Sequence, residues 1–416
     1  MDKNTTETAF SKVVKLLPMK KICKLISYTR VDKYVKKLFT SKFLGAMIFA
    51  QINQTESIAA LSGSIRANPD LQNAIKLESI STSQLSRRLK ETDSSFWEKV
   101  FTQVTTHILP ANTPQAWKAN NSNRIRIIDA STITLTLSNF IWADYRSTKA
   151  GVKIHRSLIY SDCIVYPDKT ILTEAKKSDK SQMDELLTTD QDALHAFDRG
   201  YVDYRKWDEY CADGLRFVTR LRSNAIINIL EERTVDNTGI TESIVTLGDP
   251  KTTGMKHKLR LIRTTDTQGN AVIILTNDLT MSALGISDAY RLRWQIELFF
   301  KWIKQHLKVK KFFGKSQNSV YSQIWLALIT YCLLLMVKLE LSENGTLLDI
   351  QRGLKDTLFK PYEVFLEVLR MIPRQVNPRN KRKAADPDEQ YERLLEWIER
   401  YGSASLDVID TDMNYL

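Results

Sequence analysis

An apolar run of 14 residues, "IWLALITYCLLLMV" at 324–337, constrains the fold of this chain more than any other feature. A membrane-spanning helix needs about 20 predominantly apolar residues, and this run is shorter. The start of the chain, "MDKNTTETAFSKVVKLLPMKK", also lacks the uninterrupted apolar core of a signal peptide. We therefore interpret the run as a buried helix of a soluble protein, and we predict no membrane partner.

Composition and net charge indicate a globular protein with a polyanionic partner. The 416 residues are 43% hydrophobic and 26% charged, which is typical of a globular chain of two or three domains. Sixty Lys and Arg against 48 Asp and Glu give a net charge of +12. This excess favours a polyanionic partner, and nucleic acid is the leading candidate.

Other motifs exclude several classes of site. The four cysteines are far apart and form no CxxC pair, so they indicate neither a zinc cluster nor a disulfide framework, and a reducing cytosol fits them best. The five histidines show no metal-ligand spacing, which also argues against zinc. A phosphate-binding GxxxxGK[ST] loop is absent from the sequence, which argues against an ATP-driven function.

Residues 1–115 show the apolar spacing of helices and predict a helical N-terminal DNA-binding domain. The segment "TSQLSRRLKE" begins at an N-cap near Ser81 and carries Arg87, Arg88 and Lys90. It is typical of the recognition helix of a helix-turn-helix. The alternative is a solvated basic helix face.

From residue 123 the apolar period changes to that of strands, with one helix expected at about 203–213. We predict an α/β catalytic domain at 116–315 with a β-rich insertion at about 215–282. The pattern is helical again over 316–416, which we predict to serve DNA contacts or dimerisation. The basic segment "PRQVNPRNKRK" in this region is either a DNA-backbone contact or a disordered tail.

The segment "YRLRWQIELFFKWIKQHL", at 290–307, predicts one amphipathic helix with an unusual polar stripe. At about 100° per residue, four polar side chains fall in one narrow sector that borders the apolar face. These are Tyr290, Arg293, Glu297 and Lys304. An ordinary set of surface ion pairs is the alternative, but a carboxylate held there would also face a cleft.

Two aspartates add to Glu297. Asp129 is expected to end the strand "RIRIID", and Asp198 to end "ALHAFD" before an exposed turn. Each alone is more typical of a turn or an N-cap. Together the three give oxygen ligands on rigid elements, which suit Mg²⁺ or Mn²⁺. Two such ions can drive chemistry on a phosphodiester, with Arg293 and Lys304 binding DNA phosphates beside them.

A strand after the first aspartate, within "GVKIHRSL", carries Lys153 and His155 on one face. This face either lines a DNA channel or belongs to a solvated edge strand.

The chain resembles the DDE transposases of the insertion sequence four family. The spacing Tyr-x2-Arg-x3-Glu-x6-Lys over 290–304 matches the helix signature of that family, and the contexts "IIDAST" and "FDRGYVDY" match those of its two aspartates. The stretch "DKYVKKLFTSKFLGAMIFAQINQTESIAALSGSI" is also similar to the helical N-terminal domain of one branch.

The resemblance implies a ribonuclease H-like catalytic domain with a β-strand insertion. It implies metal-dependent cutting of double-stranded DNA at terminal inverted repeats and joining of the 3′-hydroxyl ends to target DNA, by a homodimer in the cytoplasm of a bacterium, associated with the nucleoid. Two Mg²⁺ or Mn²⁺ ions would be held by Asp129, Asp198 and Glu297. Residues that would hold the DNA end are Tyr290, Arg293 and Lys304.

One position departs from the family. Several relatives stack a Trp of the insertion on a flipped base during hairpin formation, whereas this chain has Val272 at the corresponding place. Base stacking contributes about 1–3 kcal/mol, so another aromatic residue supplies it or the hairpin step differs. A metal-dependent nuclease that does not join DNA and a catalytically silent DNA-binding regulator are the alternatives to a transposase.

Overall fold

The computed structural model describes residues 7–111, 124–161, 164–188, 193–221, 224–234, 240–252, 254–265, 271–307, 309, 311–341 and 346–371. The chain divides into two compact units. Among the described residues, unit 1 comprises those within 7–203, 214–216 and 295–371, and unit 2 comprises those within 204–213 and 217–294. The basic segment "PRQVNPRNKRK" lies outside the described residues.

The N-terminal part of unit 1 is helical, as predicted. Its helices are α1 (Ala9–Lys15), α2 (Met19–Thr29), α3 (Thr40–Ile52), α4 (Ile58–Ala67), α5 (Pro69–Ile75), α6 (Thr82–Glu91) and α7 (Ser94–Ala111). Local sequence sets several of their ends. Asn68 caps α5 with Pro69 at its first position, and Ser81 with Gln84 forms a capping box at the start of α6.

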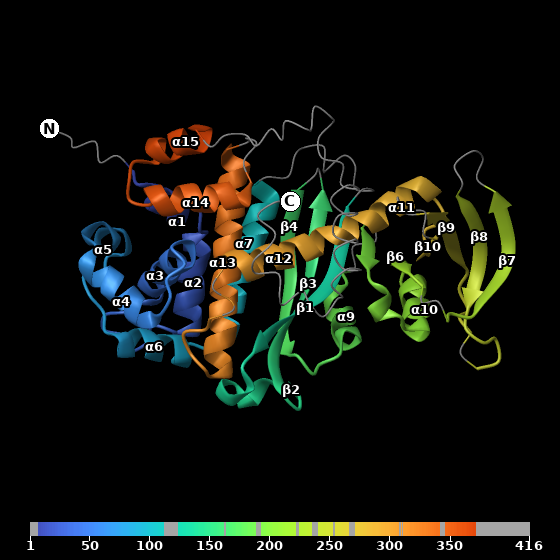
Figure 1. Ribbon diagram of the computed structural model, residues 1–416, viewed down its shortest axis with the longest axis horizontal. Coiled ribbons are helices and arrows are strands. Elements are labelled where there is room, and N and C mark those ends of the chain that lie inside the picture. Colours follow the sequence, from blue (N-terminus) through green and yellow to red (C-terminus); the bar gives the residue numbers. More distant parts are fainter. Residues whose placement is uncertain are drawn as a thin grey trace. The chain divides into compact units, whose positions relative to one another are not determined.

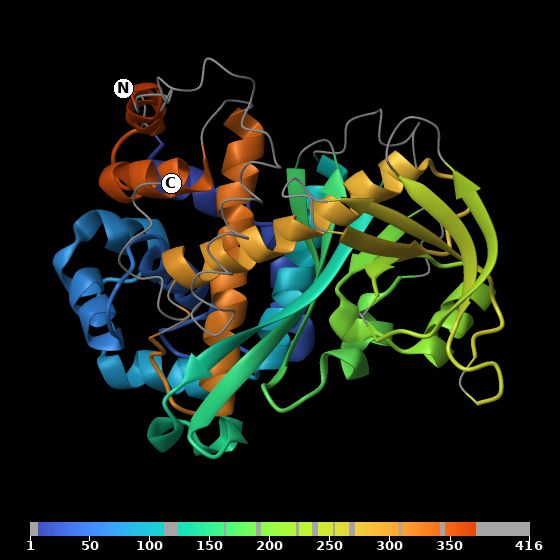
Figure 2. The ribbon, with the colours of Figure 1, turned by 45° about the vertical axis from the view of Figure 1, so that its right-hand side comes forward.

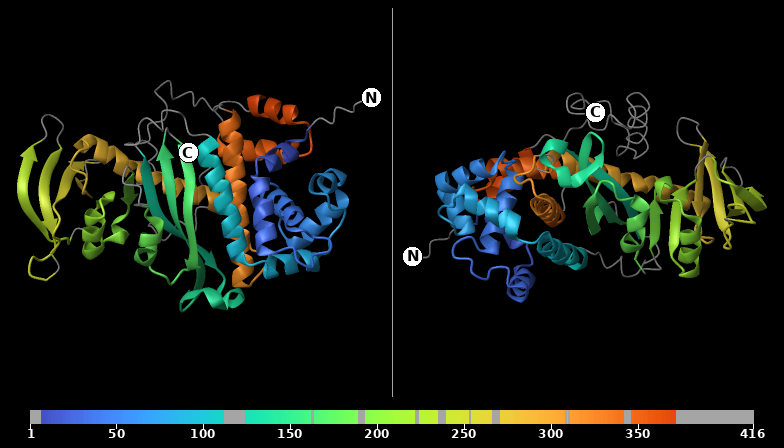
Figure 3. Two further views of the ribbon diagram at one scale, coloured as in Figure 1. Left: turned by 180° about the vertical axis from the view of Figure 1, so that it is seen from behind. Right: turned by 90° about the horizontal axis from the view of Figure 1, so that it is seen from below.

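The C-terminal helices complete the core of unit 1. They are α12 (Gln295–His306), α13 (Gln317–Leu341), α14 (Leu347–Thr357) and α15 (Tyr362–Met371). By length and composition alone α13 could cross a membrane, but 78% of an apolar 18-residue stretch of this helix is buried in the protein. It packs on α3, α6, α7 and α14, and it runs beside α7 (Figures 1 and 3). The apolar run at 324–337 is therefore confirmed as part of a core helix.

Unit 1 contains a mixed sheet. Its strands are β1 (Ile125–Leu135), β2 (Asp144–Arg146), β3 (Lys149–Ser161), β4 (Ile164–Glu174) and β5 (Leu194–Phe197). The order is β4-β3-β1-β5, with β2 at the end of β3. The β4–β3 and β3–β1 pairs are antiparallel, while β1 and β5 are parallel. Three antiparallel strands followed by a parallel strand beside the first are the arrangement expected of a ribonuclease H-like domain.

Short helices connect these strands. They are η2 (Leu137–Asn139), η3 (Ile141–Ala143), η4 (Asp179–Gln182), α9 (Met183–Leu186) and η5 (Arg199–Tyr201).

Unit 2 contains an antiparallel sheet where the β-rich insertion is predicted. Its elements are α10 (Tyr204–Ala212), β6 (Arg216–Arg220), β7 (Ile227–Thr234), β8 (Thr241–Leu247), β9 (Leu259–Thr265), β10 (Ala271–Thr276), α11 (Ala283–Arg291) and η6 (Leu292–Trp294). The strands follow the order β6-β10-β9-β8-β7 (Figure 2). The helix α10 confirms the one predicted at about 203–213, and Val272 lies on β10 opposite Thr264.

Candidate active site

The parallel register of β1 and β5 brings two aspartates side by side. Ile128 is the partner of Phe197, and Asp129 and Asp198 are the next residue on each strand. Both aspartates are half-buried. Adjacent strands are about 4.8 Å apart, so the two carboxylates project from neighbouring backbone positions.

The expectation that Asp129 ends its strand is wrong, because β1 continues to Leu135. The pairing with β3 extends over the whole of β1, from Ile125 to Leu135. Only the pairing with β5 stops at Ile128. Asp129 is thus the first residue of β1 beyond the parallel pair, and its carboxylate accepts a hydrogen bond from the backbone N–H of Ala130 at 2.8 Å.

Glu297 comes from the helix that covers the same strand. It lies in the first turn of α12, is half-buried, and belongs to a helix that packs on β1. Asp129, Asp198 and Glu297 therefore stand on adjoining elements of unit 1. Among the described residues no group of three or more His, Cys, Asp or Glu side chains forms a ready-made metal cage.

The donor set nevertheless suits a hard cation. All three side chains are half-buried carboxylates on regular elements or directly after one. Mg²⁺ prefers oxygen donors, keeps several of its waters and commonly takes only one or two carboxylates. An open arrangement of three carboxylates can accept such an ion without a closed cage.

Arg156 is a buried cation on the same face of the sheet. It pairs directly with Asp129 across β1 and β3, and cross-strand partners point to one face. Its guanidinium lies 4.3 Å from the centre of the Phe299 ring and 5.3 Å from that of Phe101. None of its three nitrogens has a hydrogen-bond partner among the described residues. Burial lowers its pKa to about 10, so the side chain remains charged at neutral pH.

Arg156 is not among the site residues predicted from the sequence. The sequence does hint that Arg156 is buried. In "KIHRSL" alternate residues face the same side of the strand, which places Arg156 on one face with the apolar Ile154 and Leu158.

Lys153 and His155 lie on the face of the sheet opposite Asp129 and Arg156, so the DNA contact predicted for Lys153 would lie on a different face from the carboxylates. The side chain of Lys153 is 15% exposed and contacts Asp179 Oδ1 at 3.0 Å and the carbonyl of Lys177 at 2.9 Å. Residues three apart on a strand face opposite sides, which separates Lys153 from Arg156 and its partner Asp129. Lys153 is therefore used inside the protein.

His155 is buried beside Lys153. Its Nε2 lies 2.8 Å from Thr173 Oγ1, and its Nδ1 lies 3.5 Å from Asp179 Oδ1. Burial lowers its pKa to about 4, although Asp179 acts in the other direction. The imidazole is therefore neutral at pH 7.

The single helix predicted over 290–307 is wrong, because the 3₁₀ turn η6 separates α11 from α12. Side chains three apart eclipse in a 3₁₀ turn. Here the Arg293 guanidinium lies over the Tyr290 ring, 5.9 Å from its centre. Tyr290 and Arg293 belong to unit 2, whereas Glu297 and Lys304 belong to unit 1. The four residues are therefore divided between α11, the η6 turn and α12.

Lys304 keeps its predicted relation to Glu297. Both are half-buried on α12, and seven residues separate them, which is about two helical turns. The two side chains therefore share one side of α12.

The two arginines of α6 differ in their surroundings. Arg87 is exposed. Arg88 contacts Asp32 Oδ1 and Thr40 Oγ1 at 2.5 Å and the carbonyl of Val31 at 3.1 Å. Its side chain is 12% exposed. Arg88 thus holds α6 to the start of α3, which leaves Arg87 as the more accessible of the two for the predicted DNA contact.

Comparison with known proteins identifies the family of the chain. A family described as "Transposase DDE domain" matches residues 120–333, a little over half of the chain. Residues 5–75 match a family described as a domain of unknown function.

Two curated relatives are similar over half of the chain. A probable transposase for insertion sequence element IS5377 of Geobacillus stearothermophilus is 32% identical over 217 residues, which are 50% of this chain and 55% of the relative. A candidate transposase of Sinorhizobium fredii, y4zB, is 33% identical over 220 residues, which are 50% of this chain and 60% of the relative. The matched region therefore spans little more than half the length of these relatives.

A solved structure also resembles the chain. It is the piggyBac transposase synaptic complex with hairpin DNA, which matches with a TM-score of 0.42 and 11% identity over 94% of this chain and 90% of the other. Likeness at this level is too low to indicate function.

Proposed function

Because the chain belongs to the Transposase DDE domain family, we propose that it is an insertion-sequence transposase. It would cut double-stranded DNA at terminal inverted repeats and join the 3′-hydroxyl ends to target DNA. The observation that carries the proposal is the parallel register of β1 and β5, which sets Asp129 and Asp198 side by side beneath the helix of Glu297.

The three carboxylates would hold two Mg²⁺ or Mn²⁺ ions. Ions at such a site supply activation of the attacking water or 3′-hydroxyl and stabilisation of the leaving oxygen. The contribution of the protein is to fix the ligands. Asp129 is fixed by its pairing with β3 and Asp198 by the four buried residues of β5. Glu297 is fixed by the buried face of α12.

Cationic side chains would bind the DNA. Lys304 shares a side of α12 with Glu297 and suits a phosphate contact as a point charge. Arg293 would bind a phosphate with its planar guanidinium, and Tyr290 would support it through the contact of its ring. The net charge of +12 favours such a polyanionic substrate. A homodimer that pairs two element ends, acting in the bacterial cytoplasm, completes the proposal.

The test is a strand-transfer assay. The wild-type protein, Mg²⁺, labelled duplex that carries the inverted repeat beside the gene, and a target plasmid should give joined products. Cutting without joining would favour a nuclease, and binding without cutting would favour a silent regulator.

Variants then test the site. Asp129→Asn, Asp198→Asn and Glu297→Gln should each abolish cutting, while DNA binding measured without metal changes little, because each removes a metal ligand and not a DNA-binding cation. Glu363→Gln on α15 is the matched control, since this exposed carboxylate lies on another element. Near-normal cutting by any of the three site variants would overturn the metal assignment.

A further inference from the structure

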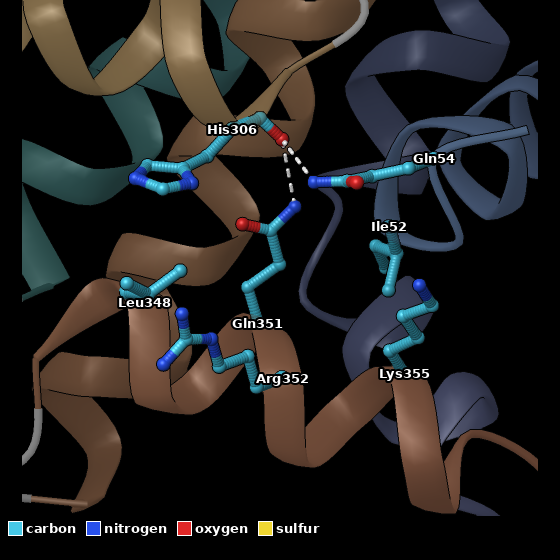
Figure 4. A pocket seen from close by; sticks show the side chains of 7 residues that line it. All are labelled: Ile52, Gln54, His306, Leu348, Gln351, Arg352 and Lys355. Carbon is cyan, nitrogen blue, oxygen red and sulfur yellow. Dashed lines mark hydrogen bonds between the residues drawn. The ribbon is translucent and has the colours of Figure 1, made fainter. Parts of the chain in front are cut away.

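A cavity of about 220 Å³ lies in unit 1 at the end of α12, away from the three carboxylates. It is formed where α12 ends beside α14 and beside the turn after α3 (Figure 4). The lining residues are Ile52, Gln54, His306, Leu348, Gln351, Arg352 and Lys355. A single water occupies about 30 Å³ of liquid, so the cavity has room for several waters or a small polyatomic group.

Two glutamines fix one wall of this cavity. The carbonyl of His306, at the C-terminus of α12, accepts hydrogen bonds from Gln351 Nε2 at 2.8 Å and from Gln54 Nε2 at 3.4 Å (Figure 4). Carbonyl groups in the last turn of a helix lack intrahelical donors, and these two amides supply them. The wall is thereby held by contacts between three separate segments.

Gln54 also has an unusual backbone conformation at this wall of the cavity. Gln54 has a φ of 51°, in the left-handed region that favours glycine. Residues with a Cβ rarely adopt this conformation. Here the conformation accompanies a side-chain amide that reaches His306, so the position serves the cavity wall as well as the end of α3.

The charged side chains that line the cavity are both positive. Arg352 and Lys355 lie one turn apart on α14 and are both exposed, and the seven lining residues include no carboxylate. The neighbouring acids of α14 are Asp349, which caps that helix through Thr346, and Asp356, which does not line the cavity. Burial and the charge of Arg352 lower the pKa of His306, so its ring adds a neutral polar edge.

We propose that this cavity binds a backbone phosphate of the DNA, with Arg352 and Lys355 as the cationic contacts. The proposal rests on the proposed function. His306 is nine residues beyond Glu297 on α12, about 13 Å along the helix axis. A duplex bound at the carboxylates would therefore pass within reach of the cavity. The cavity would thus anchor the duplex beside the cut.

The test compares two doubly substituted full-length proteins. Arg352→Gln/Lys355→Gln removes both cations of the cavity. Lys360→Gln/Arg370→Gln removes the same charge from exposed positions near and on α15. Binding of a 30-base-pair duplex is measured without metal by fluorescence anisotropy at several salt concentrations. The cavity variant should bind about tenfold more weakly, with a salt slope smaller by about 1–2, whereas the control should bind like the wild type.

Two further measurements separate the explanations. Equal weakening in both variants, or none in the cavity variant, would overturn the proposal even if the wild type cuts and joins DNA. Inorganic phosphate and a deoxynucleoside monophosphate are tested by thermal shift. A shift at millimolar concentration that the cavity variant loses, with duplex binding unchanged, would assign the cavity to a free anion and overturn its role in DNA binding. A wild-type protein that binds duplex through the cavity but never cuts would instead overturn the proposed function.

Discussion

Asp129 on β1 lies directly opposite Arg156 on β3 in the antiparallel register. The first of the three carboxylates therefore has a buried cation as its cross-strand neighbour. Such neighbours have Cα atoms about 4.5–5.5 Å apart. The guanidinium is held by aromatic rings and not by hydrogen bonds among the described residues, which is an unusual environment for a charge.

Replacing Arg156 with Met should leave the free energy of unfolding unchanged or raise it by about 1–2 kcal/mol, because an apolar side chain of similar length avoids the desolvation cost of the charge. Arg156→Lys should be less stable than Arg156→Met, since an ammonium is more strongly hydrated and cannot stack as a plane. Urea unfolding of both variants measures this. A loss of more than about 2 kcal/mol in Arg156→Met would show that the guanidinium stabilises the native state.

The same variant tests the electrostatic role of Arg156. A neighbouring cation favours the ionised form of a carboxylate, and metal ligation requires that form. We expect the acid limb of the pH–rate profile for DNA cutting to move to higher pH in Arg156→Met and to return toward the wild-type position in Arg156→Lys. An unchanged acid limb would mean that Arg156 acts only in packing.

The buried His155 predicts how stability depends on pH. Its pKa is about 4 in the folded protein and about 6.5 when exposed, so the unfolded chain binds more protons between these values. Stability should be complete above pH 6.5 and decline as the pH falls toward 4, by up to about 3 kcal/mol. The variant His155→Gln should lose this part of the slope in urea titrations at several pH values. His107→Gln is the matched control, because that ring is exposed. A slope unchanged in His155→Gln would contradict the assignment.

Arg87 and Arg88 form a matched pair for separating stability from DNA binding. Arg88→Ala should lower the free energy of unfolding by about 3 kcal/mol, because it leaves Asp32 half-buried without its cation. Arg87→Ala should change stability by less than about 0.5 kcal/mol. If α6 is a recognition helix, Arg87→Ala should also weaken duplex binding.

Thermal unfolding and anisotropy on the same preparations check both variants. The double variant Asp32→Asn/Arg88→Met should recover part of the stability lost in Arg88→Ala. A failure to recover any would show that the ion pair is not the cause of the loss.

Periodicity in the sequence predicted most of the elements because it reports which face of each element is buried. It identified α13, the helical N-terminal segment and the change to strands near residue 123. It also selected Asp129, Asp198 and Glu297, and the structure sets these three on adjoining elements. The register of β1 with β5 depends on contacts between residues about 70 positions apart, and local patterns do not encode such contacts.

The departures of the structure from the predictions have two physical causes. The η6 turn follows neither a proline nor a glycine, so no local signal separates α11 from α12. Lys153 and Arg88 looked like surface cations because charge usually means exposure. Their partners, Asp179 and Asp32, are distant enough in sequence that only the folded chain shows the pairing. The residues next to a Lys or Arg in the sequence do not show whether its side chain forms an ion pair inside the folded protein.

The packing of α13 affects the order in which the chain folds. This helix covers α3, α6 and α7, although more than 200 residues separate it from each of them. Contacts of such separation are slow to form, and a chain made from its N-terminus gains them late. The N-terminal helices therefore leave the ribosome well before their principal apolar partner is synthesised. Until α13 follows, their unburied faces make the nascent chain a substrate for chaperones that bind apolar surface.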